Sequence, residues 1–155
     1  TGLSFSEAKI FIDRYFEIHH AIKAYLDETK TKAHVDGFVE TMFGRRRYFP
    51  EINSGVPMLI ASAERMAINM PIQGTAADIM KKAMLAVDGW LKQSKLSATM
   101  LMQVHDELVF EVDRDVASQV ARGVKEMMEG VETFEVPLVV EVEQGENWGE
   151  MEESL

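Results

Sequence analysis

The sequence contains no cysteine, so disulfides and thiolate metal sites are excluded, and a reducing compartment is the matching environment. Proline is scarce, at four of 155 residues, and no low-complexity linker or internal repeat is visible. No apolar run is long enough to span a bilayer, and we expect no secretory leader. These absences favour a globular protein, and the length allows one domain with a hydrophobic core.

Basic residues are absent from the last part of the chain. No Lys or Arg follows Lys125, whereas ten of the 26 acidic residues do. The net charge of −10 argues against a free-standing nucleic-acid binder, yet residues 1–125 are neutral overall and carry all 16 basic residues. Local basic clusters lie at Arg45-Arg46-Arg47, Arg65 and Lys81-Lys82, and local charge decides contact with phosphates.

Apolar periodicity and turn residues predict an α+β protein. Ser4 and Glu7 have the spacing of a capping box, and a helix is predicted from about Glu7 to Lys30. Its predicted apolar face consists of Ile10, Phe11, Tyr15, Ile18, Ile22 and Leu26. Strands are predicted over 38–42 and 46–49, joined by a turn in which Gly44 takes a positive φ.

Two further helices are predicted over 57–70 and 72–95, with a kink or boundary at Pro71, because proline removes a backbone donor. The buried face of the second is predicted at Ile72, Ala76, Ile79, Ala83, Ala86 and Trp90. A hairpin over 98–113 follows, then a helix capped by Asp113 or Asp115, and a strand over 138–142. We expect that strand to complete a three-stranded antiparallel sheet with helices on one face, and the tail from Gly145 to Leu155 to fray beyond Trp148.

The run Gln103-Val104-His105-Asp106-Glu107-Leu108-Val109-Phe110 places two adjacent carboxylates between alternating apolar stretches. This pattern predicts a tight β-hairpin with His-Asp-Glu at its tip. One interpretation is a polar turn, since Asp suits turns. The other is a site for a hard divalent ion such as Mg²⁺, which takes one or two carboxylates plus substrate phosphates.

A metal-dependent phosphohydrolase built on the pair His105-Asp106 is a further alternative. It would need additional His and Asp ligands from other helices. The remaining histidines all lie in or near the first helix; they are His19, His20 and His34.

Arg65, Asn69 and Gln73 are spaced by four residues, so they share one helix face if the kink at Pro71 is mild. A cation and two amides can donate to phosphates, sugars and base edges, and a solvated helix face is the alternative. The run Gln73-Gly74-Thr75-Ala76-Ala77-Asp78 is no phosphate loop and by itself indicates tight helix packing. The arginines of Gly44-Arg45-Arg46-Arg47 suit either phosphate contact or a soluble strand edge.

Taken together and in this order, these segments closely resemble the C-terminal part of the family A DNA polymerases, the bacterial polymerase I type. The resemblance covers essentially the whole chain, and the hairpin run with the Gln-Gly-Thr-Ala-Ala-Asp run is very specific. The matching runs are Gly37-Phe38-Val39-Glu40-Thr41, Gly44-Arg45-Arg46, Ala63-Glu64-Arg65, Ile68-Asn69-Met70-Pro71, Gln73 to Asp78, Gln103 to Val112 and Gly145-Glu146-Asn147-Trp148.

The resemblance implies a role for each candidate residue. Asp106 is expected to be a catalytic metal ligand and Glu107 its neighbouring, less critical catalytic carboxylate. His105 is expected near the primer 3′ end. The helix residues expected to bind the minor groove of primer–template DNA are Arg65, Asn69 and Gln73.

The implied reaction is attack of a primer 3′-hydroxyl on the α-phosphate of a deoxynucleoside triphosphate, assisted by two Mg²⁺ ions. The family's second metal-binding aspartate and its nucleotide-binding helix have no counterpart here. We therefore expect residues 1–155 to be inactive alone and to need the preceding part of the polymerase as a partner. A non-catalytic module that binds primer–template or completes a split polymerase is the alternative.

The resemblance also implies a domain division and a location. Residues 1–95 would be a helical region derived from the fingers, with the hairpin near 38–49. Residues 96–155 would belong to the palm, with the His-Asp-Glu hairpin, a helix and a final strand. A bacterial or phage-infected cytoplasm is the expected location.

Overall fold

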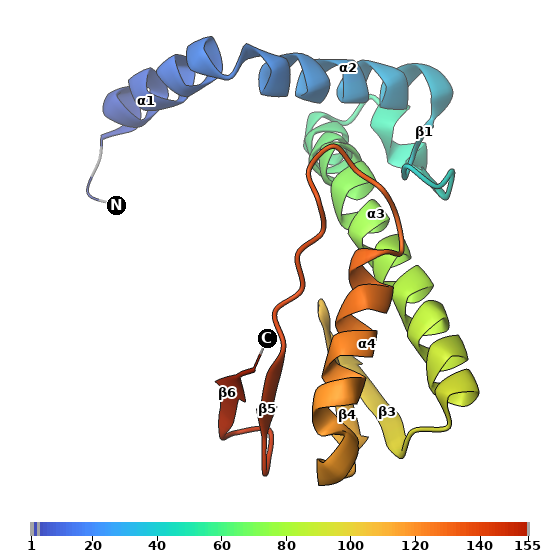
Figure 1. The fold of residues 1–155 in the computed structure, drawn as a ribbon. Helices are drawn as coiled ribbons and strands as arrows, with labels where there is room; N and C mark the ends of the chain where they lie inside the picture. The colour runs from blue at the N-terminus through green and yellow to red at the C-terminus, as the bar shows by residue number, and fades with distance from the viewer. Residues whose placement is uncertain (1, 3, 155) are drawn as a thin grey trace. The chain divides into compact units, whose positions relative to one another are not determined.

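The computed structural model describes residue 2 and residues 4–154, with the side chain of Glu153 excepted. Helices combine with small antiparallel sheets, so the predicted α+β class is confirmed (Figure 1). The chain forms two compact units, Thr1–Thr75 and Ala76–Leu155, and the division falls inside helix α3 (Pro57–Ser94). Each unit is described by itself. None of the helices in the described residues has the length and apolar character needed to cross a membrane.

The first unit begins with helix α1 (Phe5–Ile18) and the predicted capping box is present. The Ser4 hydroxyl accepts a hydrogen bond from the Glu7 amide at 3.4 Å, and the Glu7 carboxylate accepts one from the Ser4 amide at 2.9 Å. The hydrogen bonds from Ser4 lower the pKa of Glu7 below its usual value.

The prediction of one helix over 7–30 is wrong, because the chain breaks at His19 and helix α2 (His20–Asp36) follows. His19 has φ −102° and ψ 54°, outside the helical region, and its ring lies 4.6 Å from that of Tyr15. No proline or glycine marks this break in the sequence, so local composition gave no sign of it.

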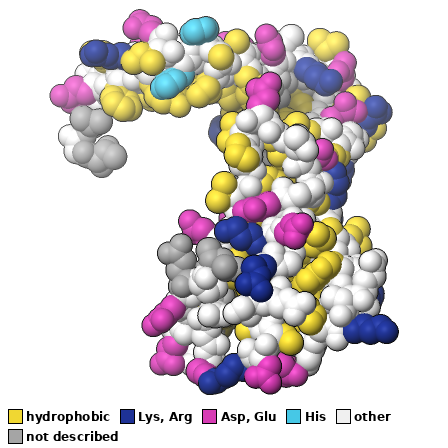
Figure 2. Space-filling view, in the orientation of Figure 1, with side chains coloured by type: hydrophobic (Ala, Val, Ile, Leu, Met, Phe, Trp, Pro, Cys, Tyr) yellow, Lys and Arg dark blue, Asp and Glu magenta, His cyan; other side chains and the backbone are white. Residues whose placement is uncertain are grey.

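The predicted apolar face of α1 is exposed rather than buried. Ile10, Phe11 and Ile18 are 68%, 69% and 65% exposed, and α1 has no buried residue. Figure 2 shows hydrophobic side chains along the surface of this helix. The periodicity correctly predicted an amphipathic helix, but nothing in the described residues covers the apolar side.

A short hairpin follows α2, and its turn is as predicted. Strand β1 (Phe38–Glu40) pairs antiparallel with β2 (Arg46–Tyr48), and Gly44 in the turn has φ +79°. After the short helix η1 (Pro50–Asn53), α3 completes the unit. The core of this unit collects small and large apolar side chains from α2, β1, η1, α3 and the residue that follows β2: Ala33, Val39, Phe49, Ile52, Ala63, Ala67 and Met70.

His34 ties α2 to η1 and α3. Its Nε2 lies 2.9 Å from Glu64 Oε1 and its Nδ1 lies 3.1 Å from Asn53 Oδ1, while Asn53 Nδ2 donates to the His34 carbonyl. Both ring nitrogens therefore face acceptors, which a protonated imidazolium satisfies. The hydrogen bond to Glu64, and then that to Asn53, raises the pKa of His34. Lys30 lies 3.8 Å from the same Glu64 carboxylate.

The predicted boundary at Pro71 is wrong, because α3 continues through it from Pro57 to Ser94. Packing partners on both sides of the proline outweigh the one hydrogen bond that its ring removes. The predicted buried face is only partly correct: Ala83 is buried, but Ile72 is 63% exposed and Ala76 is exposed. The helix passes from one unit to the other, so its buried side changes along its length.

The second unit packs helix α4 (Ala117–Glu129) against the last part of α3 and the hairpin of β3 (Ala98–Val104) and β4 (Glu107–Val112) (Figure 1). Val87, Val120 and Val124 form its buried centre. Gly123 permits this packing, because a Cβ there would lie 2.1 Å from Cζ2 of Trp90.

The predicted third strand over 138–142 is absent, and the predicted hairpin 98–113 forms a two-stranded sheet of its own. Leu138, Val140 and Val142 are half-buried between exposed neighbours, so the alternation is real, but no strand in the described residues pairs with it. Instead β5 (Glu143–Gly145) pairs with β6 (Met151–Glu153). The expected fraying beyond Trp148 is therefore wrong for these residues, and Leu155 lies outside the described residues.

The predicted capping of α4 by an aspartate is also not found. A short helix η2 (Arg114–Val116) precedes α4, and neither Asp113 before η2 nor Val116 before α4 makes a side-chain capping hydrogen bond. The extra turn separates both aspartates from the free amides of α4.

Candidate active-site residues

Asp106 lies in a two-residue turn between β3 and β4. Val104 pairs with Glu107 at the end of the ladder, which leaves His105 and Asp106 outside it. His105 has φ +54°, and Asp106 does not share the positive φ. Glycine is the residue that normally occupies a turn position with positive φ. Gln103 supports the turn by donating from Nε2 to the His105 carbonyl at 2.8 Å.

A histidine at this position carries a cost in backbone energy. A side chain in the left-handed region costs about 1–2 kcal/mol, and glycine would avoid it. Strain of this kind is concentrated at functional sites, where the side chain matters more than the ease of the turn. The chain thus has a histidine, His105, at a turn position where the backbone geometry favours glycine.

The three side chains of the tip are open to solvent. His105, Asp106 and Glu107 are all exposed, and within the described residues none of these side chains has a hydrogen-bond or ion-pair partner. Among the residues described, no three His, Asp or Glu side chains gather to hold a metal. Adjacent carboxylates still suit a hard divalent ion that completes its shell with water and phosphate oxygens.

The second candidate group lies along one continuous stretch of α3, in the first unit. Because α3 runs unbroken through Pro71, Arg65, Asn69 and Gln73 share one face over about 12 Å. All three side chains are exposed and have no partner among the described residues. The shared face that the spacing predicted is therefore present.

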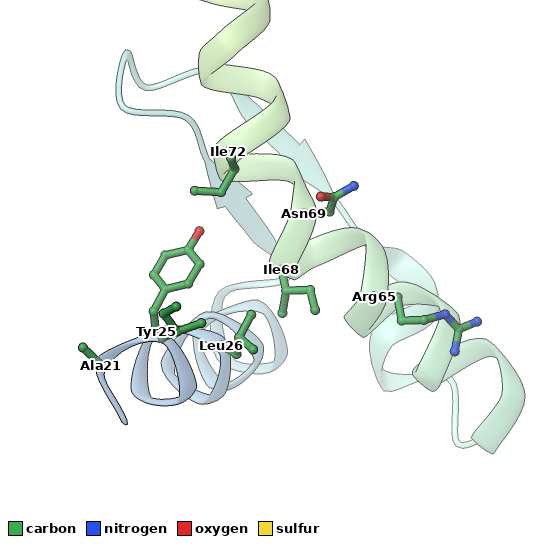
Figure 3. A pocket seen from close by; sticks show the side chains of 8 residues that line it. Ala21, Tyr25, Leu26, Arg65, Ile68, Asn69 and Ile72 are labelled. Atoms are coloured by element: carbon green, nitrogen blue, oxygen red, sulfur yellow. The ribbon is translucent and has the colours of Figure 1, made fainter. Parts of the chain in front are cut away.

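Arg65 and Asn69 also border an open apolar groove of about 630 Å³ between α2 and α3. In Figure 3, Ile68 and Ile72 extend toward Tyr25 and Leu26, whereas Arg65 and Asn69 extend away from α2. Gln73 does not line this groove. The Tyr25 hydroxyl is buried and has no hydrogen-bond partner in the described structure.

The arginines of the β1–β2 hairpin contact protein groups rather than pointing freely into solvent. Arg45 donates to the Gly74 carbonyl, Arg46 pairs with Glu40 at 2.6 Å, and Arg47 lies over the Phe49 ring. The hydrogen bond to Glu40 raises the pKa of Arg46 above its ordinary value. These contacts favour a structural role for the cluster over a phosphate site.

The structure brings the candidates together in two groups. Arg65, Asn69 and Gln73 lie on one helix of the first unit, and the residues of the tip lie on one turn of the second. Sequence reasoning missed the contact between Arg45 and Gly74, because residues 29 positions apart show no spacing signal.

Comparison with known proteins identifies the class. Residues 1–150 match the family described as DNA polymerase family A. The chain is 52% identical over 149 residues to DNA polymerase I of Pseudomonas aeruginosa, covering 96% of this chain and 16% of that protein. It is 48% identical over 147 residues to the thermostable DNA polymerase I of Thermus aquaticus, covering 95% of this chain and 17% of that protein.

A solved structure agrees with the sequence relatives. The polymerase domain of Pol1 from M. smegmatis, in complex with DNA primer–template and dNTP, matches with a TM-score of 0.85 and 41% identity. The match covers 88% of this chain and 24% of that one. The chain belongs to DNA polymerase family A. It spans about one sixth of the length of the curated relatives named here.

Proposed function

We propose that this chain takes part in template-directed DNA synthesis, the transfer of a deoxynucleotide from its triphosphate to a primer 3′-hydroxyl. The observation that carries the proposal is the exposed, unpartnered Asp106 at the tip of a short hairpin in a chain of this family. The related Pol1 polymerase domain was solved with primer–template and dNTP, which supports DNA and deoxynucleoside triphosphates as partners.

Asp106 would be the metal ligand, with the Glu107 carboxylate beside it. Two bound Mg²⁺ ions would stabilise the attacking and leaving oxygens of the transfer. The antiparallel ladder and the hydrogen bond from Gln103 hold the backbone of Asp106 before any ion arrives. Such preorganisation is how a carboxylate contributes to charge stabilisation without reorganising during the reaction.

The other candidates would contact the primer–template. His105, next to Asp106, would lie near the primer 3′ end. Arg65, Asn69 and Gln73 would donate to acceptors in the minor groove, which are similar for every correct base pair. Contacts of this kind test the geometry of a pair without reading its sequence.

We further propose that residues 1–155 alone do not extend a primer. Asp106 and Glu107 are neighbours in one turn, and the symmetric two-metal clamp needs ligands around both ions. The partner would be the remaining polymerase domain, with residues 1–95 belonging to the fingers and 96–155 to the palm. The bacterial relatives support a cytoplasmic location.

Primer extension with Mg²⁺ and all four triphosphates tests the function. The chain is assayed alone, and then mixed with the upstream polymerase segment of a family A relative. Extension only in the mixture supports the proposal. Extension by the chain alone would contradict the proposed division of the metal site, and no extension in an intact polymerase carrying this chain would contradict the function.

A second readout does not depend on activity. Paramagnetic Mn²⁺ should broaden the NMR signals of residues 105–107 selectively, and Asp106→Asn should weaken that broadening. Broadening that is uniform over the acidic C-terminal segment, or unchanged in Asp106→Asn, would contradict the metal-ligand assignment.

A further inference from the structure

The turn of the β1–β2 hairpin is hydrogen-bonded to the part of α3 that carries Gln73. The Arg45 guanidinium donates from Nη2 to the Gly74 carbonyl at 2.8 Å. The Met42 amide donates to the Thr75 hydroxyl at 3.0 Å, and Thr75 is only 7% exposed. Two hydrogen bonds thus join one hairpin turn to two consecutive residues of the helix.

Thr41 stabilises the turn conformation that directs the Arg45 side chain toward α3. Its hydroxyl accepts from the Phe43 amide at 3.3 Å and from the Arg45 amide at 3.2 Å. Its carbonyl accepts from the Gly44 amide at 3.0 Å. Thr41 is 5% exposed, so these bonds are shielded from water. The guanidinium is therefore presented by an ordered turn rather than by a free loop.

The helical segment that receives Arg45 is intrinsically weak. Pro71 cannot donate a hydrogen bond to the preceding turn, and Gly74 is a poor helix former. Glycine is nevertheless required at this position, because a Cβ on residue 74 would lie 2.7 Å from Cγ2 of Thr41. It would also lie 3.3 Å from Arg45 Nη2. A contact from outside the helix compensates for the weakness within it.

Gln73 lies between Pro71 and the two residues that accept hydrogen bonds from the hairpin turn, Gly74 and Thr75. Its exposed side chain has no partner in the described structure. Its direction is set only by the backbone that carries it. We propose that Arg45 is a positioning residue, which fixes the backbone at Gly74 so that Gln73 is presented to DNA in one orientation. This inference rests on the proposed function, in which Gln73 contacts the minor groove.

Arg46 provides the matched control. It belongs to the same hairpin and carries the same charge, but it pairs with Glu40 and lies 4.5 Å over the Phe38 ring. Both partners belong to β1, so removing Arg46 changes the hairpin charge without removing a contact with α3.

A double-mutant cycle in an intact polymerase containing this chain tests the proposal. Arg45→Ala and Gln73→Ala should each lower kcat/KM for extension about tenfold, the loss expected for the one hydrogen bond between Gln73 and DNA. The double variant should be no worse than either single variant, because both remove the same contact with DNA. Arg46→Ala and Gln73→Ala should instead act independently. Arg45→Lys should restore part of the rate, since an ammonium can donate to the same carbonyl.

Amide hydrogen exchange distinguishes the loss of the Arg45–Gly74 contact from a mere loss of positive charge on the hairpin. Arg45→Ala should accelerate exchange over residues 70–77, and Arg46→Ala should not. Thr75→Val, which removes the acceptor for Met42 and keeps the side-chain shape, should accelerate the same segment. That variant keeps the test available if Arg45→Ala fails to fold.

Independent effects of Arg45→Ala and Gln73→Ala would overturn the proposal, as would unchanged exchange over 70–77 in Arg45→Ala. Normal extension by Gln73→Ala would overturn it as well. A wild-type protein that does not extend primers would overturn the proposed function instead, and the exchange experiment would still decide whether Arg45 orders the helix.

Discussion

The two hairpins of the chain use their turns in opposite ways. In β1–β2, the turn holds a glycine at positive φ, and one of its side chains and one of its amides donate hydrogen bonds to α3. In β3–β4, the turn holds a histidine at positive φ, and the side chains at its tip have no partner in the described residues. The first turn supports the structure around it, whereas the second keeps polar groups available. Unpartnered side chains on a strained turn are the better indicator of a functional site.

The largest effect on catalysis should come from a substitution in the β3–β4 turn. Asp106→Ala in an intact polymerase containing this chain should lower kcat by about 10³-fold or more, since metal ligation provides several kcal/mol of transition-state stabilisation. Single-turnover primer extension measures this, with Glu107→Ala as a control that should lose less. A near-normal rate in Asp106→Ala would exclude it as a metal ligand.

Substitutions where the β1–β2 turn packs against α3 should change the stability of the fold. Gly74→Ala should lower the free energy of unfolding by about 1–3 kcal/mol, because the added methyl group overpacks against Thr41. Gly89→Ala in the same helix is the control: its Cβ would meet nothing within 4 Å, so alanine should be neutral or stabilising. Urea unfolding of both variants measures the difference. Equal stabilities would show that the turn and the helix separate easily.

A third comparison exchanges the turn residues themselves. Gly44→Ala should destabilise by about 1–2 kcal/mol, because residue 44 has φ +79°. His105→Gly should retain or raise stability by up to about 1 kcal/mol and lower the rate of primer extension. Thermal unfolding and extension are measured on the same preparations of an intact polymerase containing this chain. Loss of stability in His105→Gly would mean that the histidine supports the turn.

The smallest effect on stability should come from His34, whose hydrogen bonds link α2 to η1 and α3 in the first unit. Its pKa is raised by Glu64 and Asn53, so its stabilising effect is complete below the unfolded value of about 6.5. The effect is lost as the pH rises through the raised pKa of the folded chain. The Tm difference between wild type and His34→Gln should therefore shrink from about pH 5 to about pH 9, while a constant difference would show that His34 is not protonated in the fold.

Several features could be predicted from the sequence because they depend on neighbouring residues. The capping box, the turn at Gly44 and the hairpin over 98–113 each follow from a few consecutive side chains. The spacing of Arg65, Asn69 and Gln73 also predicted a shared face, which required α3 to continue. Their roles, like that of Asp106, come from the resemblance to family A and stay predictions.

The errors have a common physical origin in distant contacts. Pro71 argued for a boundary, but the packing of α3 on both sides of it maintains one helix. The alternation over 138–142 argued for a strand, but a strand needs a neighbour that composition does not reveal. The break at His19 depends on one residue's backbone angles, with no proline or glycine to signal it.

The apolar side of α1 has a practical consequence for anyone who handles these residues in isolation. Soluble monomers rarely expose contiguous apolar patches larger than a few hundred Å². With Ile10, Phe11 and Ile18 each more than half exposed, the purified chain should bind the dye ANS strongly and elute from a sizing column in a concentration-dependent way. Mild detergent should suppress both behaviours, so the choice of buffer will affect every measurement made on the chain alone.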